Sequence, residues 1–203
     1  MGSPSAITRL RSVLAAFLLA IGLVGCGVNE IPTREERAKA TWGEVENQYQ
    51  RRADLIPNLV ETVRGYAAHE KEVLEGVVRA RAAAVQTPPG SGVLESPEHF
   101  HDYEQRQAEL SGALGRLLAI VENYPDLKAN QNFLALQSQL EGTENRIAVA
   151  RRDYIGAVQE FNTELRTFPG RLWAIVLYRD AKPMPVFAAD AEARQPPKVS
   201  FGG

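Results

Sequence analysis

The chain has 203 residues and a net charge of −2, with 44% hydrophobic and 24% charged residues. These proportions are ordinary for a folded globular protein and exclude full disorder, collagen and a multi-span membrane protein. The near-neutral charge argues against nucleic-acid binding, which needs a basic domain. The single cysteine excludes an internal disulfide and a cysteine-rich zinc site.

Residues 1–25 have the pattern of a secretory signal peptide. Arg9 and Arg11 precede an uncharged apolar run of 13 residues, 13–25, whereas a membrane-spanning helix needs about 20. The run leads into Leu-Val-Gly-Cys at residues 23–26, which resembles the lipobox of bacterial lipoproteins. The resemblance implies cleavage before Cys26 and lipidation of its thiol, with a diacylglyceryl group and often further acylation of the new amine. The alternative is a signal anchor in which Cys26 is an ordinary buried cysteine.

Cleavage would leave a mature chain of 178 residues with a net charge of −4, since Arg9 and Arg11 are lost. This acidic balance disfavours binding to anionic lipid through bulk charge, so the acyl chains would hold the protein at the membrane. Residues 26–33 contain Pro32 and show no periodicity, which predicts a short lipidated tether.

Helical spacing predicts a first long helix over residues 34–84. Thr33, with Glu35 and Glu36 behind it, marks its start. Pro57 is expected to bend or restart this helix, with Asp54 as the cap. A Pro/Gly/Ser-rich loop over 86–95 follows. Ser96 and Pro97 then predict the N-cap and first position of a second helix, which ends before Pro125.

A third helix is predicted over residues 126–167, antiparallel to the second after a tight corner at 124–126. Its apolar positions alternate spacings of three and four, with one stutter, for about five heptads. They are Phe133, Leu136, Leu140, Thr143, Ile147, Ala150, Tyr154, Val158, Phe161, Leu165 and Phe168. At 1.5 Å per residue such a helix is about 63 Å long, which favours long helices packed side by side.

The sequence Phe-Pro-Gly at 168–170 ends this helix, and the apolar run LWAIVLY follows at 172–178. Periodicity alone does not separate a buried helix from a buried strand here. We expect a short helix that closes one end of the bundle; contact with a bilayer or a partner is the alternative. Pro183, Pro185, Pro196 and Pro197 predict an extended tail over 181–203.

The predicted fold is therefore all-α: an elongated antiparallel bundle of three long helices plus a short C-terminal helix. The predicted order is a signal peptide (1–25), a lipidated tether (26–33), the helical bundle (34–180) and the tail (181–203).

Few residues suggest chemistry. His69-Glu70 begins like a zinc-protease motif, but Val73 stands where the second histidine should be. The pairs Arg51-Arg52 and Arg151-Arg152 suit phosphate or carboxylate, although helix-surface ion pairs are the commoner role. Asn58, Asn145 and Asn162 lie beside apolar positions, where a buried amide would set helix register. No catalytic residue, metal or cofactor is predicted.

Several strings, in order along the chain, resemble the LemA family. They are RRADLIPNLV at 51–60, GYA at 65–67, YPDLKANQNFL at 124–134, TENRI at 143–147 and later Tyr154, Asn162 and Phe168-Pro169. The resemblance covers nearly the whole mature chain. It implies a helical bundle, mainly of three antiparallel helices, on a membrane-tethered protein without established catalytic residues or cofactor.

The resemblance also implies a role in envelope quality control, because family members are often encoded beside TPM-domain membrane proteins or HtpX-type membrane proteases. Many relatives have a longer N-terminal membrane anchor without a lipobox cysteine. A lipoprotein member would instead place its whole domain on the extracytoplasmic, periplasmic side of the bacterial cell membrane.

Our sequence-based hypothesis is a lipid-anchored, non-catalytic adaptor in the bacterial cell envelope that binds an envelope protein and no nucleic acid. The strings RRADLIPNLV and YPDLKAN are the candidate partner surfaces, and the alternative is that Asp54 and Asp126 cap helices. The rival functions are self-assembly through the heptad seam and an envelope hydrolase that uses a carboxylate pair. The candidate interaction or structural residues are Arg51, Arg52, Asp54, Pro57, Asn58, Asp126, Lys128, Asn130, Glu144, Asn145 and Arg151, and Cys26 is the lipidation site.

Overall fold

The computed structural model describes residues 27–86 and 92–187. This part of the chain forms six helices and no strand, so the all-α prediction is confirmed. It divides into two compact units. Unit 1 comprises residues 27–40 and 157–183, and unit 2 comprises the described residues of 41–156 and 184–187. No helix in the described ranges is long and apolar enough to cross a membrane.

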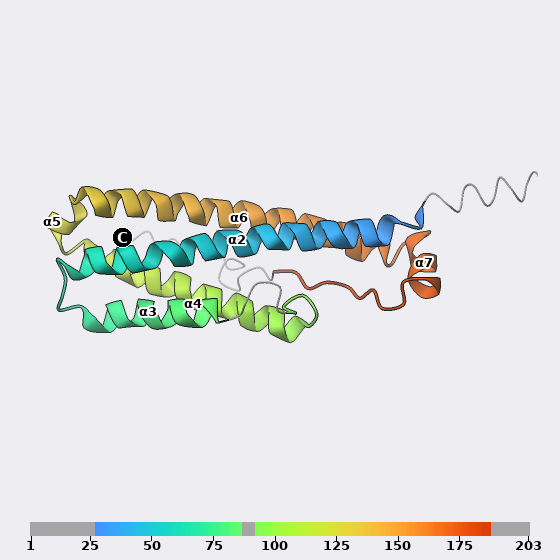
Figure 1. The fold of residues 1–203 in the computed structure, drawn as a ribbon, viewed down its shortest axis with the longest axis horizontal. Coiled ribbons are helices and arrows are strands. Elements are labelled where there is room, and N and C mark those ends of the chain that lie inside the picture. The colour runs from blue at the N-terminus through green and yellow to red at the C-terminus, as the bar shows by residue number, and fades with distance from the viewer. Residues whose placement is uncertain (1–26, 87–91, 188–203) are drawn as a thin grey trace, which may run out of the picture. The chain divides into compact units, whose positions relative to one another are not determined.

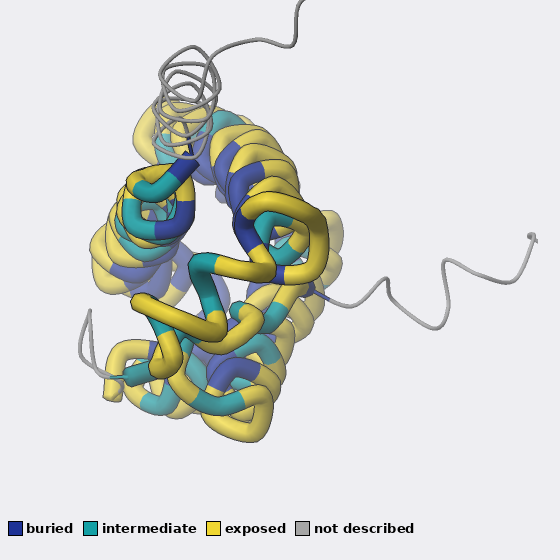
Figure 2. Tube along the Cα trace, turned by 90° about the vertical axis from the view of Figure 1, so that its right-hand side faces the viewer, coloured by how far each residue is buried: buried dark blue, intermediate teal, exposed yellow. Residues whose placement is uncertain are grey.

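Unit 2 is built from four helical segments that alternate in direction (Figure 1). They are α2 (Glu30–Arg64) from residue 41 onward, α3 (Lys71–Val85), α4 (Pro97–Val121) and α6 (Gln131–Glu164) up to residue 156. The four-residue helix α5 (Pro125–Lys128) lies in the corner between α4 and α6. Figure 2 shows the burial that results, with the buried positions on the inner sides of the helices.

The core of unit 2 is apolar over most of its length. Its buried side chains include Ile56, Leu59, Val63, Leu74, Val77, Leu110, Leu114, Leu117, Leu127, Phe133 and Leu140. Removing this much apolar surface from water is the main force that holds the helices together.

A cluster of aromatic side chains forms a second part of the core of unit 2. The ring of Trp42 lies 5.4 Å from Phe100 and 5.2 Å from Tyr154, measured between ring centroids. Phe187, from the segment beyond the helices, lies 5.0 Å from Phe100. The hydroxyl of Tyr154 donates to the carbonyl oxygen of Pro185 at 2.8 Å. Phe187, within the predicted tail, is therefore part of the core of unit 2; residues 188–203 lie outside the described residues.

Unit 1 contains the start of α2, the end of α6 and α7 (Gly170–Val176). Arg37 donates to Glu160 at 2.7 Å, and Arg34 lies 3.4 Å from Glu164, so ion pairs join the two long helices here. Gly170 is required after the Phe168-Pro169 corner, because a Cβ at this position would collide with the backbone carbonyl of Glu164.

The first long helix differs from the prediction in two ways. It begins at Glu30 rather than Arg34, since Pro32 falls in the first turn, where a missing N–H costs nothing. It also ends at Arg64, so residues 34–84 are not one helix: a turn at 65–70 separates α2 from α3, which packs against α4. Buried positions continue across this turn at Ala67, so apolar spacing alone did not reveal it.

The restart expected at Pro57 is wrong, because α2 continues through that residue. A proline leaves the carbonyl four residues earlier without its helical partner. Here that carbonyl belongs to Ala53, and the side chain of Arg81 in α3 donates its Nε–H to it at 2.7 Å. A contact between two helices thus replaces the hydrogen bond that Pro57 removes.

The later elements agree better with the prediction. Ser96 caps α4 and accepts hydrogen bonds from the backbone of Glu98 and His99, as expected. The third helix begins at Gln131 instead of 126, because α5 precedes it. Its seam is buried or half-buried from Phe133 to Leu165, whereas Phe168 is 84% exposed. The run LWAIVLY forms a helix, but it is not the buried cap that we expected.

The pairing of Pro57 with Arg81 predicts a specific double-mutant result. Arg81→Met should cost about 1–3 kcal/mol of unfolding free energy, because the Ala53 carbonyl loses its donor. In a Pro57→Ala background the restored N–H satisfies that carbonyl, and the same substitution should cost less than about 1 kcal/mol. Urea unfolding followed by circular dichroism measures both values. Equal losses in the two backgrounds would show that Arg81 acts in another way.

Candidate functional site

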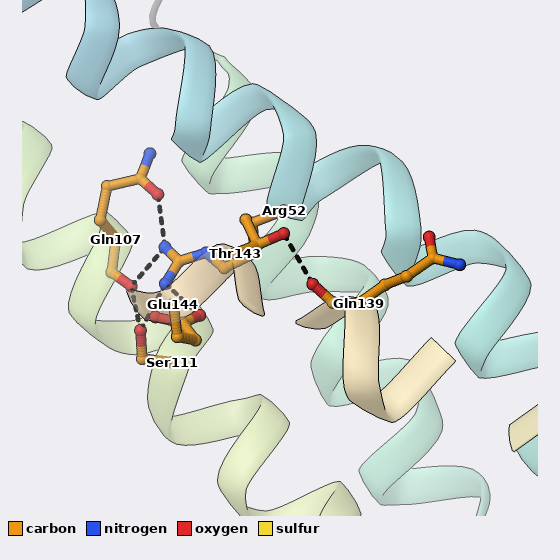
Figure 3. Close-up of polar contacts among 6 residues, drawn as sticks. All are labelled: Arg52, Gln107, Ser111, Gln139, Thr143 and Glu144. Atoms are coloured by element: carbon orange, nitrogen blue, oxygen red, sulfur yellow. Dashed lines mark hydrogen bonds and ion pairs between the residues drawn. The ribbon is translucent and has the colours of Figure 1, made fainter. Parts of the chain in front are cut away.

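Arg52 is the centre of the polar site in unit 2 (Figure 3). It comes from α2 and is 1% exposed. Its Nη1 donates to Ser111 Oγ at 2.7 Å and to Glu144 Oε1 at 3.0 Å. Its Nη2 donates to the side-chain oxygen of Gln107 at 2.7 Å and to the carbonyl of Gln107 at 3.2 Å. A buried guanidinium needs such partners, and these come from α4 and α6.

Gln107 extends this network to α3. Its side-chain N–H donates to the carbonyl of Ala84 at 3.2 Å, near the end of that helix. Ser111 donates in turn to the carbonyl of Gln107 at 3.1 Å. The Arg52 cluster, defined as Arg52, Gln107, Ser111 and Glu144, therefore connects all four helical segments of unit 2.

A pocket of about 190 Å³ lies beside the Arg52 cluster. Tyr49, Glu104, Ala108, Ile147 and Arg151 complete its lining. Arg151 lies 3.4 Å from Glu104 and stacks over the ring of Phe187, with its guanidinium carbon 4.1 Å from the centroid. Two arginines and two glutamates thus face the pocket in two pairs. This balance of charge does not favour the phosphate or carboxylate ligand that the arginine pairs suggested.

Three buried tyrosines of unit 2 are held in the neutral state. Burial raises the pKa of Tyr49, and the positive charges of Arg151 and Arg52 offset part of that increase. Burial also raises the pKa of Tyr103, with a further contribution from the carboxylate of Glu46. The pKa of Tyr154 is raised by burial. An ionised phenolate loses its hydration in this environment, which disfavours the charged form.

The structure brings together three of the predicted residues, Arg52, Glu144 and Arg151, around the pocket. The neighbouring Arg51 is exposed, as are Pro57, Asn58 and Asn145. The expectation that Asn58 and Asn145 are buried amides is therefore wrong. Asn58 lies two positions after the buried Ile56 and Asn145 two positions after the buried Thr143, and both face outward. Asn162 is half-buried.

The capping roles expected for two aspartates are also wrong. Asp54 lies inside α2 and accepts a hydrogen bond from Gln50 at 2.7 Å. Asp126 is exposed in the first turn of α5, whose N-terminus has no side-chain cap. The residue that caps α6 is Asn130, whose side-chain oxygen accepts from the backbone of Asn132 at 2.9 Å and Phe133 at 3.1 Å.

Two turns of unit 2 meet at one end of that unit. The side-chain amide of Asn130 donates to the hydroxyl of Tyr66 at 2.9 Å, and the hydroxyl of Tyr124 donates to Glu70 at 2.9 Å. Lys128 forms an ion pair with Glu122. We call this the turn surface: residues 65–70 together with residues 122–130. The string YPDLKAN therefore lies beside GYA and His-Glu, while RRADLIPNLV lies within α2.

Sequence reasoning missed Gln107, Ser111, Glu104 and Phe187. The first three occupy ordinary polar positions of an amphipathic helix, and Phe187 follows a proline-rich stretch. Nothing in local spacing signals that they meet Arg52 and Arg151. No group of three His, Cys, Asp or Glu side chains within 27–86 and 92–187 is placed to hold a metal ion. Cys26 lies outside the described residues.

These features define an all-helical protein whose four-helix unit is organised around a buried arginine. The sequence profile of the LemA family matches residues 41–201, and the chain belongs to that family. The resemblance inferred from its sequence strings is thus confirmed.

Similar proteins include the magnetosome proteins MamQ 1 and MamQ 2 of Paramagnetospirillum magneticum, each 27% identical over 164 residues. MamQ of Magnetospirillum gryphiswaldense is 26% identical over the same length. Each match covers 73% of this chain and 60% of the relative.

The adjacent pair Arg51 and Arg52 allows a matched test of the cluster. Arg52→Met should cost about 2–4 kcal/mol, because it leaves buried acceptors on α4 without a donor. Arg51→Met removes an equal charge from an exposed position and should change the unfolding free energy by less than about 0.5 kcal/mol. Urea denaturation of both variants provides the comparison. Similar small losses for both would mean that the cluster does not hold the helices together.

The buried tyrosines predict a loss of stability at alkaline pH. Their raised pKa favours the neutral phenol in the folded state, so the stabilisation is complete below the ordinary tyrosine pKa of about 10 and declines as pH rises above it. Tyr103→Phe should make this decline shallower. Unfolding free energies measured at several pH values between about 9 and 11.5 test this. A slope identical to wild type would contradict the assignment.

Proposed function

We propose that this LemA-family protein is a lipid-anchored helical adaptor of the bacterial cell envelope, held at the membrane through Cys26 on the extracytoplasmic side. One observation supports an adaptor most directly. Arg52, the buried arginine of the LemA-like strings, uses both terminal nitrogens within its own bundle. The polar residues of the site thus serve to fix the surface that the bundle presents.

The turn surface is the proposed partner-binding region. Tyr66, Asp126 and Lys128 are exposed there, and hydrogen bonds between the two turns hold the backbone in one arrangement. A rigid surface loses little conformational entropy on binding, which favours recognition of a protein. The expected partner is an envelope protein, with TPM-domain proteins and HtpX-type membrane proteases as the first candidates.

Two rival functions receive less support. Self-assembly through the heptad seam requires a seam that is free to pair, but its residues from Phe133 to Leu165 are buried or half-buried within a single chain. A hydrolase requires a reactive carboxylate pair. Glu104 and Glu144 line one pocket, yet each faces an arginine, at 3.4 Å and 3.0 Å, which suits a structural ion pair better than proton transfer.

The test compares wild type with Cys26→Ala in cells, using metabolic labelling with a fatty acid and in-cell crosslinking. Wild type should incorporate the label, and Cys26→Ala should not, because the thiol is the acylation site. Crosslinks to envelope proteins should fall in the variant. If wild type remains unlabelled, residues 13–25 act as a signal anchor and the lipobox is a coincidence.

The same assay tests the turn surface with a matched pair of variants. Asp126→Ala should reduce crosslinking without loss of stability, since Asp126 does not cap a helix. Asn130→Ala is the structural control and should cost about 1 kcal/mol through loss of the α6 cap. Unchanged crosslinking in Asp126→Ala would exclude its side chain from the partner surface.

A further inference from the structure

Unit 1 carries a concentration of exposed apolar side chains that the adaptor function does not use. Among the described residues, five of the twelve exposed large hydrophobic side chains fall within residues 168–177. They are Phe168, Leu172, Ile175, Val176 and Leu177, between 46% and 84% exposed. Scattered apolar residues on a surface are normal, but a local cluster indicates an interaction site.

Three of these side chains form one face of α7 (Gly170–Val176), while Phe168 and Leu177 lie just outside its two ends. Leu172, Ile175 and Val176 are spaced by three and four residues, so they share a side of the helix. Phe168 lies four residues before Leu172. Trp173 lies on another side and is half-buried. The helix is therefore attached to unit 1 by one side and leaves an apolar side in solvent.

Basic residues flank this face. Arg166, Arg171, Arg179 and Lys182 are exposed, and Asp180 is the one acidic residue between positions 165 and 183, which gives the segment a net charge of +3. The chain as a whole carries −2. An apolar face with basic residues beside it is the pattern of a segment that lies in the interface of an anionic bilayer.

The position of α7 beside the start of the described chain also indicates contact with a bilayer. A Cβ on Gly27 would lie 3.1 Å from Cγ of Pro169 and 3.7 Å from Nε1 of Trp173. Gly27 directly follows Cys26 and the apolar run 13–25, and consecutive Cα atoms are 3.8 Å apart. Whatever holds Cys26 at a membrane therefore also holds the N-terminal end of α7 near its surface.

We propose that the apolar face of α7, with its basic flanks, inserts into the headgroup region of an anionic bilayer beside the point where the chain is anchored. The insertion rests on the membrane attachment given in the proposed function, whether that attachment is a lipid on Cys26 or an uncleaved signal anchor. A lipidated Cys26 and an uncleaved signal anchor place Gly27 at the same level. The contact gives the protein a second attachment point, so unit 1 is held against the membrane instead of turning freely about its anchor.

The two tryptophans of the chain provide the readout. Trp42 is 4% exposed in the core of unit 2, whereas Trp173 is on α7. Full-length protein is reconstituted into vesicles of phosphatidylglycerol and phosphatidylcholine, with or without bromine on the acyl chains, and recovered by flotation. Wild-type fluorescence should be quenched by brominated lipid, and Trp173→Phe should remove that quenching.

Two matched substitutions test the apolar face. Ile175→Glu places a charge on α7 and should reduce the quenching at least about twofold, since burial of a charge among lipids is unfavourable. Val149→Glu changes an apolar residue that is 46% exposed in unit 2 and should leave the quenching unchanged. Vesicles of phosphatidylcholine alone should also give at least about twofold less quenching, because the basic flanks lose their anionic partners.

The other outcomes overturn the inference. Protein that floats without quenching of Trp173 is anchored but does not dock α7, so only this inference fails. Protein that does not float overturns the anchoring as well. If brominated lipid does not quench Trp173, and Ile175→Glu converts a dimer to a monomer in light scattering, the face binds a second copy of the chain and not a bilayer. A monomer without quenching shows that the face contacts neither lipid nor a second copy, which overturns the inference. Quenching in a chain whose Cys26 carries no lipid label leaves this inference standing.

Discussion

A buried guanidinium fixes the arrangement of unit 2. Arg52 is almost completely removed from solvent, and its charge is tolerable only because α4 and α6 supply oxygen atoms to both terminal nitrogens. Apolar packing is non-directional and leaves some freedom in how the helices fit together. The directions of the hydrogen bonds to Arg52 remove that freedom. The network continues through Gln107 to α3, so one side chain constrains all four helical segments of unit 2.

A second polar constraint lies one helical turn away on α2. Pro57 deprives the carbonyl of Ala53 of its helical partner, and Arg81 supplies the missing donor from α3. The hydrogen bonding of α2 around Pro57 is thus complete only while α3 remains in place. Together, Arg52 and the Ala53–Arg81 contact make the position of α3 depend on specific hydrogen bonds as well as on its apolar side.

The distribution of polar and apolar groups separates structural from interactive regions. Inside unit 2, charges are paired with one another and tyrosines remain neutral, so the interior stabilises the bundle. On the outside, the turn surface presents polar residues, while α7 presents apolar ones with basic neighbours. The first arrangement suits a protein partner and the second a lipid surface. The LemA family profile covers both regions, within residues 41–201.

The sequence by itself determined the helical class, because apolar residues recur at helical spacing and Ser96-Pro97 gives an unambiguous helix start. It also identified Arg52, Glu144 and Arg151 as candidates and predicted the buried seam of α6. Only the tertiary structure decided that Arg52 is buried while Arg51 is exposed, that Gln107, Ser111 and Phe187 complete the site, and that the apolar run at 172–178 faces solvent. Local spacing reports which side of a helix is apolar. It does not report what packs against that side, and hydrogen bonds between residues more than 50 positions apart, such as Arg52 with Gln107, exist only after the helices have assembled.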